Sequence, residues 1–134
     1  MSYAMQLLDS YPRTFSLDAS LLASTIDALN DCAQACTADA DDDLSEQDVA
    51  EMVKCIRLCL DCADICTTTA AVTSRRTDYD ADVTRPLLDA CIAACKSCAA
   101  ECDLHAMMHA HCGVCAEACR RCQRACQDLL ATIA

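Results

Sequence analysis

Cysteine is the residue type in this chain whose number and spacing indicate chemistry, because it occurs 15 times in 134 residues. The cysteines form four groups, and within each group every step along the sequence is 3 or 4 residues. At about 100° per residue, such steps keep the members of a group on one face of an α-helix. The groups are Cys32 and Cys36; Cys55, Cys59, Cys62 and Cys66; Cys91, Cys95, Cys98 and Cys102; and Cys112, Cys115, Cys119, Cys122 and Cys126. A bundle helix normally buries Leu and Ile on this face, so the spacing predicts a helical core lined by thiols.

One motif, C-x3-C-x2-C-x3-C, repeats within these groups. It spans residues 55–66, 91–102 and 115–126. A chance origin is excluded by three copies of one spacing in so short a chain. Buried free cysteine can act as a small hydrophobic residue, but that role does not explain cysteine at nearly every core position of three helices.

The choice of metal follows from the softness of the ligands and from geometry. Thiolates select Cu(I), Zn(II) or iron–sulfur clusters. Structural zinc needs separate tetrahedral sets, which a continuous row of thiols along straight helices supplies poorly. Cu(I) accepts two or three sulfurs, and one thiolate can bridge two ions, so capacity would be about one ion per cysteine, on the order of 15. We therefore predict that all the cysteines are ligands of multiple Cu(I) ions.

The helices that hold these thiols are expected to be long and joined by short connections, because the chain contains only 1 Gly and 2 Pro. We expect an all-α fold: an antiparallel up-down-up-down four-helix bundle with a short N-terminal helix. The expected ranges are a short helix at 2–11, then helices from about Ser16 to Ala38, from Ser45 to Thr73, from Asp82–Arg85 to His105, and from near His111 to Thr132. Asp39–Asp43 is expected to be a charged loop, Ala106–Cys112 a bend, and Pro86 a first-turn residue. The domains would be 1–15, a short helix and linker, and 16–134, the cysteine-lined bundle.

Antiparallel helices give this bundle two different ends. One, the closed end, gathers aliphatic and threonine side chains: Leu22, Thr25, Leu29, Thr69, Ala70, Thr73, Leu87, Leu88, Leu129, Leu130 and Ile133. The other, the open end, gathers soft metal ligands: Cys36, Met52, His105, Met107, Met108, His109, His111 and Cys112. We predict that His105, His109 and His111 bind metal, and that Met52, Met107 and Met108 assist copper uptake.

Charge and targeting features narrow the function further. The formal net charge of −11 argues against nucleic-acid binding. The sequence shows no secretory signal and no apolar run long enough for a membrane span, so we expect a cytoplasmic protein with reduced thiols. Asp61 and Glu101 are expected on solvated helix faces. No catalytic constellation stands out, so we expect no enzyme activity.

Two other functions remain open from the residues. One is a general thiolate buffer that also takes Zn(II) or Cd(II), in the manner of a metallothionein. The other is a structural or redox-sensing bundle linked by disulfides. Chelator competition separates the first from a copper store, and free-thiol counting separates the second.

With these motifs in view, the chain resembles the cytosolic branch of the copper storage protein family over about residues 16–132. The resemblance rests on the three repeats, the C-x3-C pair at 32–36, and the His/Met-rich turn at 104–112. It implies cysteines that point into each bundle and bind many Cu(I) ions. It also implies a homotetramer of bundles. The sequence leaves open whether a copper chaperone delivers the ion.

Overall fold

The protein is a bundle of four long helices with one short helix beside it. The computed structural model describes residues 1–133, and no strand occurs in that range. The long helices are α2 (Ala19–Leu44), α3 (Val53–Ser74), α4 (Ala81–His105) and α5 (Ala110–Ala131). The short α1 (Tyr3–Asp9) precedes them, and a 3-10 turn at Val49–Glu51 leads into α3. None of the helices described is both long and apolar enough to cross a membrane.

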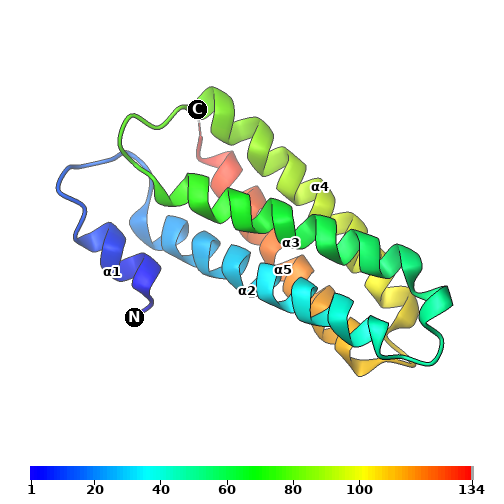
Figure 1. Cartoon of the computed structure of the whole chain (residues 1–134). Helices are drawn as coiled ribbons and strands as arrows, with labels where there is room; N and C mark the ends of the chain where they lie inside the picture. Colours follow the sequence, from blue (N-terminus) through cyan, green and yellow to red (C-terminus); the bar gives the residue numbers. More distant parts are fainter. Residues whose placement is uncertain (134) are drawn as a thin grey trace.

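Each long helix packs against its sequence neighbours, and α5 closes the ring against α2. The connections α2–α3 and α4–α5 lie at one end of the bundle, whereas α1, the α3–α4 connection and the C-terminal end of α5 lie at the other (Figure 1). This arrangement confirms the predicted up-down-up-down bundle with a short N-terminal helix. The division of the chain at residue 15 stays a prediction.

Two aspartates set the starts of the helices that enter from the closed end. The Asp18 carboxylate accepts a hydrogen bond from Leu21 N (2.9 Å) at the start of α2, and Asp80 accepts one from Asp82 N (2.9 Å) at the start of α4. Both satisfy amides that have no partner inside the helix.

The expectation of a loop at Asp39–Asp43 is wrong, because α2 continues through these residues to Leu44. Aspartate is a poor helix former, by about 0.5–0.7 kcal/mol per residue. Packing overrides this preference here, since Asp39, Ala40 and Asp43 are buried against the other helices. The second helix accordingly starts at Val53 rather than at Ser45, which instead follows the last turn of α2.

Pro86 was expected in a first turn, but it is the sixth residue of α4. The helix begins earlier than expected, at Ala81, because Asp80 caps it. Proline removes one intrahelical hydrogen bond at this depth. Its side chain lies on the exposed face, where water can satisfy the carbonyl left without a donor.

The closed end has the composition that was predicted for it. Leu22, Leu29, Leu88 and Leu129 are almost fully buried there. The buried threonines satisfy their hydroxyls within their own helices; Thr69, for example, donates to Ile65 O at 2.7 Å. This end therefore presents apolar surface to the core and leaves no threonine hydroxyl that needs a ligand.

Candidate metal centre

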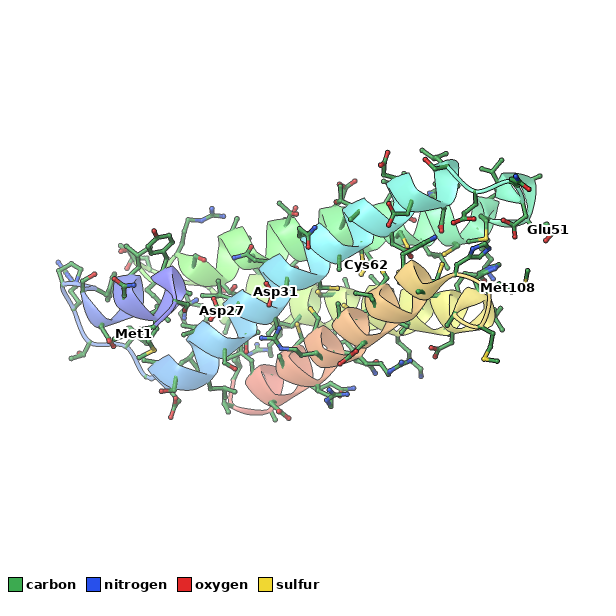
Figure 2. All side chains as sticks on the ribbon, turned by 90° about the horizontal axis from the view of Figure 1, so that it is seen from below. Met1, Asp27, Asp31, Glu51, Cys62 and Met108 are labelled. Atoms are coloured by element: carbon green, nitrogen blue, oxygen red, sulfur yellow. The ribbon has the colours of Figure 1, made fainter. Side chains whose placement is uncertain are left out.

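All the cysteines lie in the interior as free thiols, each no more than 1% exposed. They come from all four long helices, because each helix presents its cysteine face to the bundle axis. Figure 2 shows Cys62 midway along the bundle, with sulfur atoms between the ribbons. We call this set of cysteines the thiol array.

Neighbouring sulfurs in the array lie 3.6–4.0 Å apart. A continuous path of such contacts runs from Cys126 near the closed end, through Cys91 and Cys66, to Cys55 near the open end. Every thiol except Cys112 has at least one sulfur neighbour within 4.0 Å among the contacts described. These distances are far longer than the roughly 2.05 Å of a disulfide bond.

This spacing suits shared metal ions. With metal–sulfur bonds of about 2.3 Å, as in zinc thiolates, two sulfurs on one metal lie about 3.8–4.6 Å apart, from tetrahedral to linear geometry. Several groups of four cysteines have all their sulfurs within 4.8 Å of one another. Two of them are Cys32, Cys36, Cys62 and Cys119, and Cys36, Cys98, Cys115 and Cys119. Because successive groups share members, a metal bound in one shares thiolates with a metal bound in the next.

Hydrogen bonds between the thiols set their protonation. Contacts with Cys102 and Cys59 lower the pKa of Cys55. Contacts with Cys115 and Cys55 raise the pKa of Cys102 above the ordinary thiol range. A thiol whose pKa is raised keeps its proton at neutral pH, so an empty array retains protons. Metal loading must displace those protons, which couples affinity to pH.

A carboxylate completes the array at the open end. Asp39 Oδ2 accepts hydrogen bonds from Cys59 (3.4 Å) and Cys102 (3.5 Å), and Cys55 lies 4.0 Å away. These four residues form another set whose ligand atoms lie within 4.8 Å of one another. Burial raises the pKa of Asp39, although its hydrogen bond with His111 opposes the shift. The open end therefore offers a mixed oxygen–sulfur site, unlike the groups of four cysteines described above, which offer sulfur alone.

Asp43 lies one turn further along α2 and accepts a hydrogen bond from Cys112. Its Oδ1 accepts from Cys112 Sγ at 3.5 Å, whereas Oδ2 is buried and has no hydrogen-bond partner among the described residues. Burial, with added hydrogen bonding to Cys55 and repulsion from Asp39, raises the pKa of Asp43 to about 7.

Sequence reasoning missed both aspartates, because the run of acids was taken for a loop. The signal was present: Cys32, Cys36, Asp39 and Asp43 follow each other at steps of 4, 3 and 4. These are the steps that define the cysteine groups themselves.

His111 lies beside the carboxylates of Asp39 and Asp43. Its Nδ1 is 2.5 Å from Asp39 Oδ1 and 3.6 Å from Cys112 Sγ, and its Nε2 is 3.1 Å from Glu46 Oε1. Burial alone would lower the pKa of His111, but the hydrogen bonds with Asp39 and Glu46 raise it to about 8. The ring of His109 stacks on that of His111 at 5.5 Å between centroids, and its Nε2 lies 3.1 Å from Asp48 Oδ2.

The remaining predicted residues of the open end are more dispersed. His105 Nε2 pairs with Glu101 at 3.0 Å, so Glu101 is largely buried beside His105 and the expectation of a solvated face is wrong for it. Met52 is fully buried. Met107 and Met108 are 97% and 80% exposed on the α4–α5 turn, and Figure 2 shows Met108 at this extremity. The structure therefore brings His109 and His111 together and leaves these two methionines facing outward.

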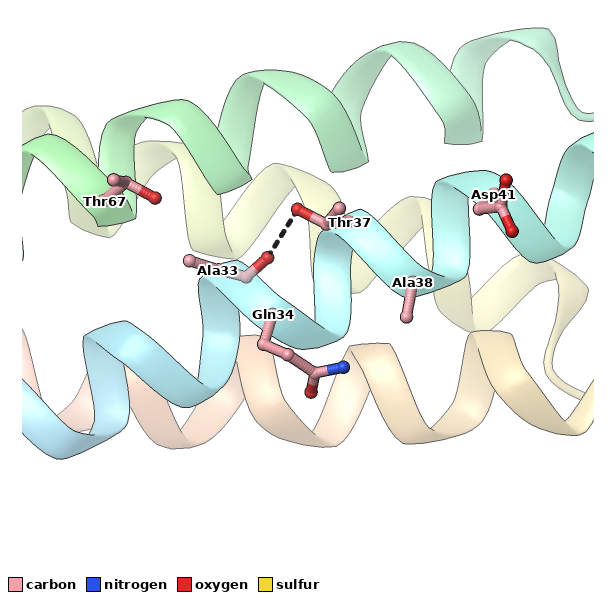
Figure 3. A pocket seen from close by; sticks show the side chains of 6 residues that line it. All are labelled: Ala33, Gln34, Thr37, Ala38, Asp41 and Thr67. Atoms are coloured by element: carbon pink, nitrogen blue, oxygen red, sulfur yellow. Dashed lines mark hydrogen bonds between the residues drawn. The ribbon is translucent and has the colours of Figure 1, made fainter.

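A wide hollow on the outer surface has a different character. Its volume is about 600 Å³, and it lies along α2 and α3 with lining residues that are mostly small (Figure 3). Thr37 Oγ1 donates to Ala33 O at 2.8 Å within it. No thiol lines this hollow, and the cysteine sulfurs lie inside the bundle.

Comparison with known families gives one match that covers most of the chain. The family model described as copper storage protein matches residues 18–131. A comparison with curated protein sequences finds no match.

Solved structures from Streptomyces lividans are similar to this chain over nearly its full length. One is a copper storage protein, Ccsp, loaded with 10 copper equivalents; it is 55% identical, covers 96% of this chain and 98% of its own, and has a TM-score of 0.94. Another is described as a cytosolic copper storage protein with five coppers; it is 57% identical, covers 86% of this chain and 96% of its own, and has a TM-score of 0.85.

Proposed function

The chain belongs to the copper storage protein family, and we propose that it stores Cu(I) inside its bundle, bound by the thiol array. The observation that carries this proposal is the unbroken path of sulfurs 3.6–4.0 Å apart along the bundle axis. Such a path suits an ion that takes two or three soft ligands and shares them with its neighbours. The related Ccsp from Streptomyces lividans, described as loaded with 10 copper equivalents, supports the same conclusion.

We assign all the cysteines as ligands, and we add Asp39 to them. Each site in the body of the array would consist of thiolates from two or more helices. The site at the open end would use the Asp39 carboxylate together with Cys55, Cys59 and Cys102. A hard oxygen ligand suits Cu(I) less well than sulfur does, so this site would hold copper more weakly. Weak sites near solvent and strong sites deeper in the bundle would draw copper inward.

His111, His109 and His105 would bind copper during uptake and release. His111 is held by carboxylates and lies within 3.6 Å of the Cys112 sulfur, so it can pass an ion to a thiol without a large movement. Met107 and Met108, exposed on the α4–α5 turn, would offer thioether sulfur to copper outside the bundle. Met52, which is fully buried, would fill space and contact copper only once it has entered.

Further proposals concern the cellular location of the protein, its oligomeric state and the donor of its copper. We propose a cytoplasmic location, supported by the cytosolic description of the relative with five coppers and by the free thiols, which suit a reducing compartment. We propose storage without catalysis, because the family is one of storage proteins. A homotetramer and a copper chaperone as donor remain proposals of the same kind.

Anaerobic titration of the fully reduced protein with Cu(I) tests the main proposal. We expect tight binding of on the order of 15 ions per chain, one for each thiolate that bridges two ions. A control with all thiols blocked by alkylation should bind almost none. A stoichiometry of one or two ions per chain would contradict the proposal.

Competition with chelators distinguishes a copper store from a general metal buffer. We expect the loaded protein to keep Cu(I) against a strong Cu(I) chelator and to lose Zn(II) readily to a zinc chelator. Equal retention of both metals would favour the metallothionein-like alternative. Mostly oxidised cysteines in protein purified from cytoplasm would instead favour the disulfide-linked bundle.

A further inference from the structure

Arg76 is a buried cation at the closed end of the bundle, and it has no acidic partner within residues 1–133. It lies in the connection between α3 and α4, and its side chain is 7% exposed. Its Nε is buried and has no hydrogen-bond partner within residues 1–133, and none of the ion pairs described there includes Arg76. The contact that it does make is with the ring of Tyr79, whose centroid is 4.6 Å from Cζ.

This situation is unusual in a chain with 21 acidic and 10 basic side chains. A buried charge that is not paired is strongly destabilising, so buried cations normally contact a carboxylate or another anion. Burial lowers the pKa of Arg76, but a guanidinium remains protonated at neutral pH. The charge therefore stays in place and lacks a counter-ion from the described residues.

Arg76 lines a small cavity between α1 and the bundle. The cavity has a volume of about 90 Å³. Its walls are mainly apolar, and no acidic residue is among the residues that line it: Ala4, Leu7, Leu8, Tyr11, Ile26, Ser74 and Arg76. The other polar groups already have partners, since Tyr11 OH bonds Thr77 Oγ1 (3.0 Å) and Ser74 Oγ donates to Ala70 O (2.6 Å).

The chemistry of these walls defines what fits. An unpartnered guanidinium at one side selects a carboxylate, which it can bind through two parallel hydrogen bonds. Leu8 and Ile26, both buried, select a short alkyl group. An apolar cavity of about 150 Å³ accommodates benzene, so a cavity of about 90 Å³ suits a smaller molecule.

We propose that this cavity is a binding site for a small monocarboxylate of the size of acetate or propionate. Its carboxylate pairs with Arg76, and its alkyl end lies against Leu8 and Ile26. The site is at the end of the bundle opposite to the histidines, and it does not depend on the metal held by the thiol array. Because Leu8 belongs to α1 and Ile26 to α2, the bound molecule stabilises the packing of α1 on α2.

Thermal unfolding of the reduced, metal-free full-length protein tests this site with sodium propionate as the probe. We expect Tm to rise with propionate concentration relative to sodium chloride at the same ionic strength, because a ligand of the folded state stabilises it. Calorimetric titration should show one site per chain. Arg76→Gln should weaken the affinity by about tenfold or more.

The matched control is Arg75→Gln, which removes the same charge from an exposed neighbour that does not line the cavity. It should bind propionate as the unmodified chain does. If Arg76→Gln does not fold, as judged by circular dichroism, Ala4→Leu provides a second test, because it fills the cavity and leaves Arg76 in place.

Three results would overturn the proposal. One is an equal Tm in propionate and in chloride, and another is an undiminished response of Arg76→Gln or of Ala4→Leu. The third is a loss of oligomer by Arg76→Gln without any response to propionate in the unmodified chain. That result would assign Arg76 to a carboxylate of a second copy.

Discussion

The closed end and the open end of the bundle are both buried, yet they satisfy their polar groups in opposite ways. At the closed end the threonine hydroxyls donate to carbonyls of their own helix, and leucines fill the space between the helices. At the open end Asp39, Asp43 and His111 bond across helices and to thiols, and Asp43 Oδ2 has no partner among the described residues. The threonines of the closed end need no metal ligand, whereas the open end has a carboxylate oxygen without a partner among the described residues.

This contrast shows how one bundle can be stable when empty and still accept many ions. The leucines of the closed end bury apolar area whether or not metal is present. The thiol array between the two ends buries small, weakly bonded groups that metal ions would connect. We expect the stability of the closed end to be independent of metal, and that of the array to increase with each ion bound.

Removal of copper should produce the largest change. An ion that binds the folded chain at 1,000 times its Kd adds about 4 kcal/mol to the free energy of unfolding, and the array provides many sites. We expect the loaded protein to resist denaturant far more than the empty protein, as measured by circular dichroism in urea. The difference should disappear after copper is extracted with a chelator. Equal midpoints for loaded and empty protein would contradict a metal-dependent array.

Truncation of the closed end should produce the next largest effect. Leu29 is fully buried, so Leu29→Ala should lower the free energy of unfolding of the empty protein by about 2–5 kcal/mol. Copper capacity, measured by titration, should stay unchanged because no thiol is removed. Leu104→Ala is the matched control, since Leu104 is 75% exposed. A loss of several ions in Leu29→Ala would show that the two ends are not independent.

A smaller effect is expected from pH, and it should come from the open end. The pKa of Asp43 is raised to about 7, so between about pH 4 and 7 the folded chain holds a proton that the unfolded chain releases. The pKa of His111 is raised to about 8, which extends this proton excess from about pH 6.5 to 8. The stability of the empty protein should therefore fall as pH rises from about 4 to 8.

Asp43→Asn should flatten the lower part of this decline, measured as urea midpoints against pH. The exposed neighbour Asp42 provides the control substitution Asp42→Asn, which should leave the profile as it is. An unchanged slope in Asp43→Asn would show that the carboxylate does not retain its proton in the folded chain.

The smallest effect on capacity is expected from the histidines. Replacement of His105, His109 and His111 together by alanine should slow copper uptake and removal and leave most of the capacity intact. Stopped-flow transfer from a Cu(I) chelator measures the rate, and equilibrium titration measures the capacity. Glu51→Ala, at an exposed position of the same end, is the control. If capacity collapses instead, the histidines are main ligands of the array.

The cysteine spacing predicted the fold and the location of every thiol, because a step of 3 or 4 residues has only one structural meaning in a chain with a single glycine. The same periodicity predicted the closed end, where Leu22, Leu88 and Leu129 are buried as expected. These features depend on short-range geometry, which the sequence displays directly.

The open end was predicted less well, because its arrangement depends on contacts between helices. Asp39 and Asp43 were taken for a loop, since local propensity disfavours aspartate in a helix and the burial that overrides it is tertiary. His105, His109 and His111 were predicted together as metal ligands, yet it is His111 that makes the contacts with Asp39 and Cys112. His111 and Asp39 are 72 positions apart in the sequence, so the spacing of neighbouring residues could not predict their contact.

The complete burial of the thiol array also affects how a binding partner could distinguish the copper-loaded protein from the empty one. Where a Cu(I) ion replaces one thiol proton, one positive charge replaces another, so binding at a protonated thiol leaves the net charge unchanged. The outer surface carries none of the cysteine sulfurs, so ions that bind to them leave that surface unchanged. Where every ion binds in this way, a full and an empty molecule would migrate alike in an electric field and differ in mass and rigidity. A cellular partner that responds to the number of bound copper ions would therefore have to contact the open end.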